Sequence, residues 1–164
     1  MSAIIATHNK KLLSDQSEKD RDCNCRVKKD CPLRGKCCTK TVVYKAEIQA
    51  ENTTKNYIGL TEGEFKTRYN EHKNSFCNSK KMSNTALSSL VWSTGQNPKP
   101  NIKWDIVQKC SIYKPSQKSC DLCLSEKLYI LKAAKDKNNI NVRNEISSIC
   151  RHRNNFKLDS TLKE

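Results

Sequence analysis

The chain has 164 residues, of which 35% are hydrophobic, and its 31 lysines and arginines outnumber 17 acidic residues to give a net charge of +14. This length suits one domain with a small appendage, and the charge indicates a polyanionic partner. No stretch is long and apolar enough to span a bilayer, and the first residues lack the basic leader of a secretory signal. Ten cysteines without such a signal indicate metal binding. A secreted disulfide-rich protein is the alternative.

The N-terminal part contains two segments of different character. Residues 1–22 are polar and mixed in charge, so we expect a disordered or loosely helical lead-in. Residues 23–40 carry cysteines at Cys-x-Cys-x5-Cys-x5-Cys spacing and almost no apolar residues, which is typical of a structural zinc knuckle. Binding of zinc, at about 10–16 kcal/mol, would suffice to fold such a segment. The expected ligands are Cys23, Cys25, Cys31 and Cys37. Cys38 is an alternative fourth ligand, and a disordered thiol-rich linker is the alternative to a metal site.

The next segment has the pattern of a β-hairpin. Residues 41–47 and 55–60 are β-branched and aromatic runs, and residues 51–54 between them are turn-like. Tyr44 and Tyr57 lie in the two runs, so the hairpin brings two tyrosines to neighbouring strands.

Residues 62–76 have the periodicity of a helix. Their ring-bearing side chains recur at spacings of four, three and four, which places on one face Phe65, Tyr69, His72 and Phe76. Arg68 precedes His72 by four residues, so the two side chains are neighbours at the edge of that face. We therefore expect a cation, an imidazole and the two strand tyrosines to converge on one small area.

A second helix and a third strand are predicted next. Ser83 or Asn84 can cap a helix whose inward residues are Leu87, Leu90 and Val91. Residues 95–100 break this helix. Residues 101–110 then alternate, with Ile102, Trp104 and Ile106 on one face, which predicts a third strand packed on the hairpin.

Residues 120–135 are helical by composition and apolar on both sides, which predicts a central helix. One face carries Leu122, Tyr129, Ile130 and Ala133, and the opposite face carries Leu124, Leu128 and Leu131. Glu126 lies in the first face, where a lone carboxylate is costly unless it is paired or binds a metal. A salt bridge to a lysine or arginine is the alternative to metal binding. A short last helix is expected from Asn141 to near Cys150.

A second set of metal ligands is split between two distant segments. The pairs are Cys120-x-x-Cys123, at the start of the long helix, and Cys150-x-His152, at the end of the last helix. Two such pairs predict a structural Cys3His zinc site that clamps the two helices together. Four unrelated groups are the alternative. We expect Cys77 and Cys110 to pack as small apolar residues.

Several of these motifs carry a family resemblance. Tyr57-Ile58-Gly59 resembles the second signature of the GIY-YIG endonuclease superfamily, and Tyr44 stands where the tyrosine of the first signature lies, although Val42-Val43 replaces Gly-Ile before it. Arg68-x-x-x-His72 is similar to the catalytic helix of that family. The run Cys-Pro-Leu-x-Gly-x-Cys at 31–37, the run at 57–63 and Cys150-Arg151-His152-Arg153 resemble the endonuclease domain of Penelope-like retroelements.

The resemblance implies a fold and an activity. The fold is an α+β nuclease domain over residues 41–153, with a small three-stranded, mostly antiparallel sheet flanked by helices, preceded by the zinc knuckle and followed by a tail at 154–164. The activity is metal-dependent nicking of target DNA, with Mg2+ or Mn2+ as the catalytic ion and Zn2+ as the structural one. DNA is the implied partner, RNA or an upstream reverse transcriptase domain are further ones, and the implied location is the nucleus. A catalytically inactive zinc-containing nucleic-acid-binding module is the alternative function.

The implied catalytic set is Tyr44, Tyr57, Arg68, His72, Glu126 and Asn141. Tyr44 would orient or deprotonate the attacking water, and Tyr57 would support the phosphate. Arg68 would grip phosphate oxygens, His72 would act as hydrogen-bond partner or proton relay, and Glu126 would hold Mg2+. Asn138 and Asn139 compete with Asn141 for its place in the set.

Overall fold

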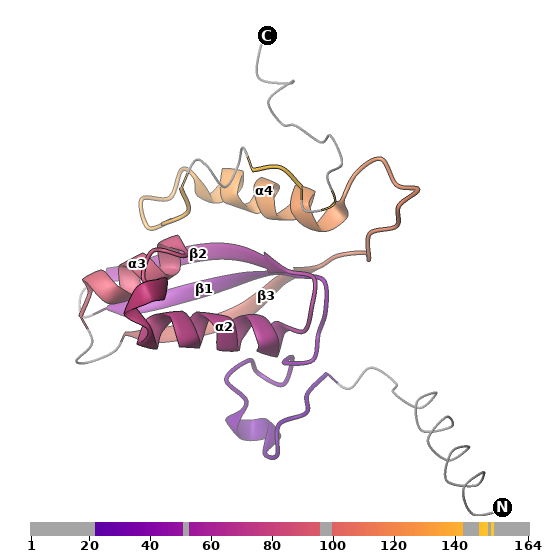
Figure 1. Ribbon diagram of the computed structural model, residues 1–164. Helices are drawn as coiled ribbons and strands as arrows, with labels where there is room; N and C mark the ends of the chain where they lie inside the picture. The colour runs from indigo at the N-terminus through magenta and orange to yellow at the C-terminus, as the bar shows by residue number, and fades with distance from the viewer. Residues whose placement is uncertain (1–21, 51–52, 96–99, 143–147, 151, 153–164) are drawn as a thin grey trace, which may run out of the picture.

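The computed structural model describes residues 22–50, 53–95, 100–142, 148–150 and 152. Within these residues the chain has an α+β fold, in which a three-stranded antiparallel sheet is flanked by three α-helices (Figure 1). The sequence predicted this class and this sheet, and both predictions are confirmed. The expected lead-in and tail, and the middle of the expected last helix, lie outside the described residues.

The sheet places the two tyrosines of the hairpin on one face. Its strands are β1 (Val42–Ala50), β2 (Thr53–Thr61) and β3 (Asn101–Lys109), in the order β2-β1-β3. Tyr44 is paired with Gly59, and Ala46 is paired with Tyr57. Because side chains alternate along a strand, Tyr44, Ala46 and Tyr57 share a face. A shift in the β1–β3 register between Val43 and Tyr44 marks a β-bulge next to this position.

Helices α2 (Phe65–Cys77) and α3 (Ala86–Ser93) cover this face of the sheet (Figure 1). The predicted inward face of α2 is confirmed, since Phe65, His72 and Phe76 are buried and Tyr69 is half-buried. Trp104 of β3 packs against four rings, with centroid distances of 5.4 to 6.5 Å. The four rings belong to Tyr44, Phe65, Tyr69 and His72. This aromatic cluster fixes α2 against the sheet, because each fully buried side chain of this size contributes about 1.5–3 kcal/mol.

The start of α3 differs from the prediction. We expected Ser83 or Asn84 to cap the helix, but the helix begins at Ala86 and Thr85 is its cap. The Thr85 hydroxyl oxygen accepts a hydrogen bond from the Ser88 N–H at 3.0 Å. Three successive residues of cap-forming type precede the helix, so the sequence pattern alone did not separate them.

Helix α4 (Asp121–Ala133) covers the opposite face of the sheet (Figure 1). Leu122 and Ile130 are buried in a cluster with Ile58 of β2. The prediction of a central helix is wrong, because Leu128 and Leu131 on its other side are 45% and 41% exposed. One apolar face is enough to dock α4, and the second faces away from the sheet.

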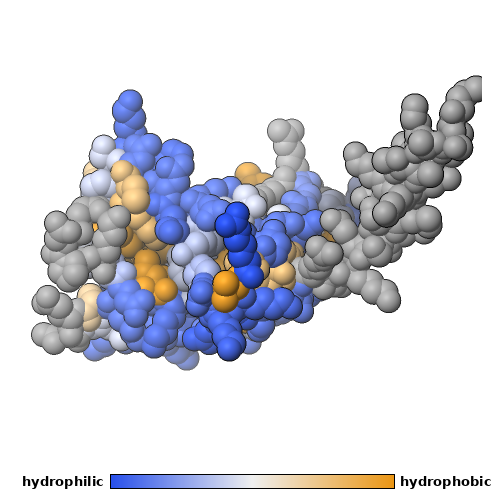
Figure 2. Space-filling view, turned by 90° about the horizontal axis from the view of Figure 1, so that it is seen from below, coloured by the Kyte–Doolittle hydropathy of each residue, from blue (hydrophilic) through white to orange (hydrophobic). Residues whose placement is uncertain are grey.

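Residues 23–40, which we call the knuckle, form a loop beneath α2 with one 3-10 turn, η1 (Lys28–Asp30) (Figure 1). Main-chain hydrogen bonds attach it to the start of α2, from Phe65 N–H to the Thr39 carbonyl at 2.9 Å and from Lys66 N–H to the Cys37 carbonyl at 2.8 Å. The face seen from the knuckle side is largely hydrophilic (Figure 2). Among the described residues, no helix has the length and apolar character needed to cross a membrane.

Candidate active site and metal centres

The hydroxyl of Tyr44 is the centre of the first candidate site. It lies 2.7 Å from Nε2 of His72, and it accepts a hydrogen bond from Nε of Arg68 at 3.2 Å. Tyr44 comes from the central strand, and the other two side chains come from one face of α2, four residues apart. The predicted convergence of a strand tyrosine with the cation and the imidazole is therefore present in the structure.

Gly59 makes room for the Tyr44 ring. A Cβ atom on Gly59 would lie 2.5 Å from the Tyr44 hydroxyl oxygen and 2.6 Å from the ring carbon that bears it. Real Cβ atoms do not approach other atoms this closely, so a larger residue here would displace Tyr44. The glycine of the Tyr-Ile-Gly motif is thus required by the packing of the tyrosine on the neighbouring strand.

Burial controls the protonation of this site. Burial raises the pKa of Tyr44 to about 12, although the charge and hydrogen bond of Arg68 act in the opposite direction. Burial, together with the charge of Arg68, lowers the pKa of His72 to about 3. Burial would also lower the pKa of Arg68, but its contacts with Tyr44 and Glu71 outweigh this effect and raise it. At neutral pH the site therefore contains a protonated tyrosine, a neutral imidazole and a charged guanidinium.

Tyr57 lies next to the same site, whereas Glu126 acts on it through its charge. The ring of Tyr57 stands edge-on to the ring of His72, with centroids 6.0 Å apart. Glu126, on α4 at the opposite face of the sheet, is half-buried; burial is the main cause of the raised pKa of Tyr44, and the negative charge of Glu126 adds to it. Four of the six predicted catalytic residues thus gather on one face of the sheet, from β1, β2 and α2.

Asn141 has a different environment from the other five. Its side-chain oxygen accepts a hydrogen bond from the Ile58 N–H, and its side-chain nitrogen donates to the Ile58 carbonyl, both at 2.8 Å. Asn138 contacts β2 through its own carbonyl, which accepts from the Asn56 N–H at 2.8 Å. The side chain of Asn139 accepts from the Asn141 N–H at 3.2 Å. Asn141 therefore anchors the strand residue next to Tyr57, and its amide is engaged with main chain.

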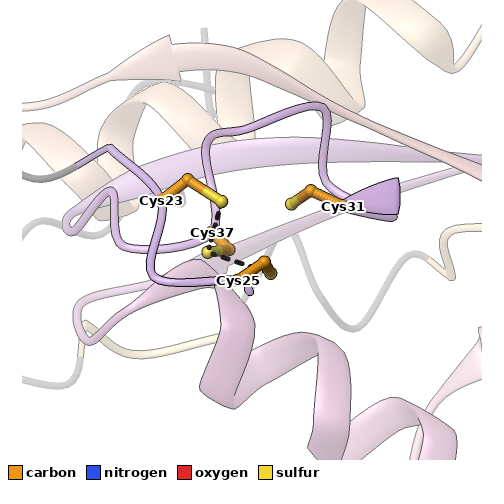
Figure 3. Close-up of side chains that lie close together, drawn as sticks. All are labelled: Cys23, Cys25, Cys31 and Cys37. Atoms are coloured by element: carbon orange, nitrogen blue, oxygen red, sulfur yellow. Dashed lines mark hydrogen bonds between the residues drawn. The ribbon is translucent and has the colours of Figure 1, made fainter. Parts of the chain in front are cut away.

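The first predicted cysteine cluster is assembled in the knuckle (Figure 3). The sulfur atoms of the four predicted ligands all lie within 4.8 Å of one another. These ligands are Cys23, Cys25, Cys31 and Cys37. Cys37 is close to two of the others, at 3.5 Å from Cys23 and 3.8 Å from Cys25. The left-handed backbone of Arg34 and Gly35 turns the chain between the third and fourth cysteines.

These distances fit zinc. A tetrahedral zinc ion with bonds of about 2.3 Å to sulfur separates its ligands by about 3.8 Å. Burial raises the pKa of Cys37, but the Asn24 N–H and the neighbouring thiols outweigh this and lower it, which favours the thiolate that a metal needs. Cys38, the alternative fourth ligand, lies 3.9 Å from the Cys37 sulfur and is half-buried at the border of the cluster. The knuckle can therefore hold a metal such as zinc.

The second predicted cluster is also assembled, at the start of α4. The sulfur atoms of Cys120, Cys123 and Cys150 lie within 4.8 Å of one another, and all three residues are buried. His152 is adjacent, with Nδ1 at 3.8 Å from the Cys150 sulfur. Three cysteines can hold a metal such as zinc here, and His152 is placed beside them as the predicted fourth ligand.

The two remaining cysteines do not share one environment. Cys110 is buried, as predicted, but Cys77 at the end of α2 is exposed, so the expectation that it packs as a small apolar residue is wrong. The described cysteines are all free of disulfide bonds.

Sequence reasoning missed three residues that contact these sites. Glu71 forms an ion pair with Arg68 at 2.7 Å, and its position three residues later on the same helix is a signal that could have identified it. The Glu62 carboxylate lies 3.2 Å from Nε2 of His152, and the ring of Tyr113 stacks on the His152 ring with centroids 4.1 Å apart. No local pattern connects these two residues to a histidine so far along the chain.

Comparison of the chain with models of protein families, with curated proteins and with solved structures finds no match. The function is therefore inferred from the geometry of the Tyr44 site and of the two cysteine clusters.

Proposed function

We propose that the protein is a metal-dependent DNA endonuclease of the GIY-YIG type, similar to the domain that nicks target DNA in Penelope-like retroelements. The observation that carries this proposal is the contact of the Tyr44 hydroxyl with both His72 and Arg68. Those three residues come from two separate motifs of the resemblance, the strand of the first signature and the helix of Arg68 and His72, and the fold brings the two motifs into contact. A role in a retroelement, a reverse transcriptase domain upstream and a nuclear location belong to the same proposal.

Arg68 is the phosphate-binding group in this proposal. It uses Nε on Tyr44 and Nη1 on Glu71, and a guanidinium has five N–H donors, so donors are left for a phosphate oxygen. Its side chain is about a quarter exposed, whereas Tyr44 below it is fully buried. Arg68 must therefore turn toward the phosphate before a water molecule reaches the tyrosine hydroxyl.

Tyr44 and His72 position the attacking water in this proposal. With a pKa of about 12, Tyr44 is protonated at neutral pH and is a weak base by itself. His72, with a pKa of about 3, is neutral and also a weak base, so its Nε2 accepts a hydrogen bond from the Tyr44 hydroxyl and leaves the tyrosine oxygen to orient the water. The water attacks phosphorus and the bond to the 3′ oxygen breaks, while the water gives up its proton to solvent and the leaving oxygen takes one up from solvent.

Glu126 is the residue that would hold Mg2+ or Mn2+. A half-buried carboxylate whose charge acts on Tyr44 fits an ion that binds one or two carboxylates and completes its shell with water and phosphate oxygens. When bound, the ion supplies positive charge to the phosphate and to the leaving oxygen. Tyr57 packs against His72 and supports that ring, and Asn141 holds the main chain beside Tyr57.

Nicking of supercoiled plasmid with Mg2+ or Mn2+ tests the proposal. We expect the wild type to nick, and we expect Glu126→Gln and Arg68→Ala to lose nicking while they remain folded. Glu47→Gln is the matched control, because Glu47 is a half-buried glutamate of β1 that pairs with Lys45. Glu126→Gln should bind DNA as well as the wild type, since the change removes a negative charge. Nicking at the wild-type rate by Glu126→Gln would remove Glu126 from the site.

One observation favours the second candidate, a zinc-containing nucleic-acid-binding module without activity. The knuckle carries exposed basic residues between and beside its cysteines. These residues are Arg26, Lys28, Lys29 and Lys36. DNA binding by this surface should weaken steeply with salt, and replacing Lys28 and Lys29 by glutamine should reduce the salt slope by about 2. If the protein is only a binding module, it should show this salt-dependent DNA binding and no metal-dependent nicking.

A further inference from the structure

The side chain of Glu62 contacts His152, which lies beside the second cysteine cluster. Its Oε1 lies 3.2 Å from Nε2 of His152, 90 residues later in the chain. The main chain of Glu62 is fixed as well, because its carbonyl accepts hydrogen bonds from the Thr41 N–H at 3.1 Å and from the Thr41 hydroxyl at 3.4 Å. Glu62 therefore approaches His152 from a backbone that is held to the start of β1.

The ring of His152 is held on three sides. Nε2 faces Glu62, and Nδ1 lies 3.8 Å from the sulfur of Cys150. The face of the ring stacks on Tyr113, with centroids 4.1 Å apart and planes inclined by 20°. The two nitrogens thus point to different groups, one to a carboxylate and the other to the thiol cluster.

We propose that Glu62 and Tyr113 complete the second metal centre by positioning His152. A histidine that binds a metal through one nitrogen commonly donates its other N–H to a carboxylate, which fixes the tautomer and the ring orientation. Here Glu62 accepts the Nε2 hydrogen, so Nδ1 is left with its lone pair on the side of the Cys150 sulfur, which belongs to the cluster of Cys120, Cys123 and Cys150. Tyr113 prevents the ring from rotating away.

This arrangement ties the metal centre to the connection between β2 and α2. Glu62 lies in that connection, which follows the strand of Tyr57 and precedes the helix of Arg68. Metal binding at the start of α4 would thus hold three segments, the connection, α4 and the segment that ends at His152. The inference rests on the metal centre and is independent of whether the chain cleaves DNA.

Zinc affinity of the full chain is the measurement, with a chromogenic chelator as competitor. We expect two zinc sites in the wild type. Glu62→Ala removes the acceptor and should weaken one of them by about 10- to 100-fold, while the other is unchanged. Glu62→Gln keeps an oxygen acceptor but loses the charge, so its effect should be smaller, and Tyr113→Leu should weaken the same site.

Glu64→Gln is the matched control, because Glu64 lies two residues further along the same connection and forms no side-chain cap with α2. Spectra of Co2+-loaded protein identify the weakened site, since a site with three thiolates and one imidazole absorbs differently from a site with four thiolates. If Glu62→Ala does not fold, the zinc affinity of Glu62→Gln still tests the proposal, because this variant keeps the size of the side chain. Unchanged affinity in every folded Glu62 variant, with only a lower melting temperature, would show a simple surface ion pair and overturn the proposal.

Discussion

The hydroxyl of Tyr44 lies 2.7 Å from Nε2 of His72, and both groups are buried between the sheet and α2. Because burial lowers the pKa of His72 to about 3, its imidazole is neutral over the whole physiological range. A neutral imidazole can accept a hydrogen bond from the Tyr44 hydroxyl, which a charged one cannot. The pair therefore acts as a single hydrogen-bonded unit beneath the guanidinium of Arg68.

Replacement of Tyr44 by phenylalanine tests this unit. The ring and its packing remain, but His72 and Arg68 each lose a hydrogen-bond partner. We expect plasmid nicking to fall by about 10²- to 10⁴-fold. The free energy of unfolding should fall by about 1–3 kcal/mol, because buried polar atoms are left without this partner. Tyr69→Phe, on the helix of Arg68 and His72, is the control and should nick normally. Equal losses in both variants would argue against a special role for Tyr44.

The neutral state of His72 predicts a dependence of stability on pH. Above its ordinary pKa of 6.5, His72 is neutral in the folded and the unfolded chain. Below 6.5 the unfolded chain binds a proton that the folded chain does not bind until about pH 3, so the free energy of unfolding falls as the pH falls through this window. The slope from this residue is at most about 1.4 kcal/mol per pH unit.

Denaturant titrations of the wild type and of His72→Gln at several pH values within this window measure the effect. Protonation of thiols and loss of metal act on both proteins alike, so the difference between them isolates His72. The variant should have the shallower dependence on pH. Parallel curves for the two proteins would show that His72 does not carry the depressed pKa.

Gly59→Ala should disturb the site more than a surface substitution of the same kind. The new methyl group would lie 2.5 Å from the Tyr44 hydroxyl oxygen, so the ring must move or β2 must shift. We expect a loss of about 1–3 kcal/mol in the free energy of unfolding and a large loss of nicking. Gly63→Ala is the matched control, because a Cβ there meets no atom within 4 Å. Normal nicking by Gly59→Ala would mean that the position of Tyr44 is not critical.

The fourth ligand of the knuckle can be decided by metal analysis. Cys37 belongs to the group of four sulfur atoms, whereas Cys38 only borders it. Cys37→Ser should lower the zinc content from about two ions per chain to about one, and Cys38→Ser should leave it unchanged. Cys77→Ser is a neutral control on an exposed thiol. A loss of zinc in Cys38→Ser alone would exchange the roles of the two cysteines.

The elements and the local part of the site were predictable because their signals are short-range. Runs of β-branched and aromatic residues around a turn identified β1 and β2, and alternation of apolar residues identified β3. The spacing of rings identified the inward face of α2. The pairing of Arg68 with His72 follows from the pitch of a helix. Ligand types at characteristic spacing likewise identified both cysteine clusters.

The remaining features depend on tertiary packing and have no local signal. An apolar stripe such as Leu128 and Leu131 has the same pattern whether or not another segment covers it. The sequence left three asparagines as competitors, and only the register of the chain beside β2 shows that the Asn141 side chain meets Ile58. The contact of Glu62 with His152 joins residues that no periodicity relates.

The two hydrogen bonds of Asn141 to Ile58 have a consequence for association between chains. β2 is an outer strand of the sheet, and its free edge is a template on which another chain could add a strand. Asn141 makes with Ile58 the pair of bonds that such a strand would make, and the Asn56 N–H and carbonyl are bonded to Asn138 and Ile140. The middle of this edge is thus closed by the chain itself, so residues 138–141 protect the protein against edge-to-edge aggregation through β2.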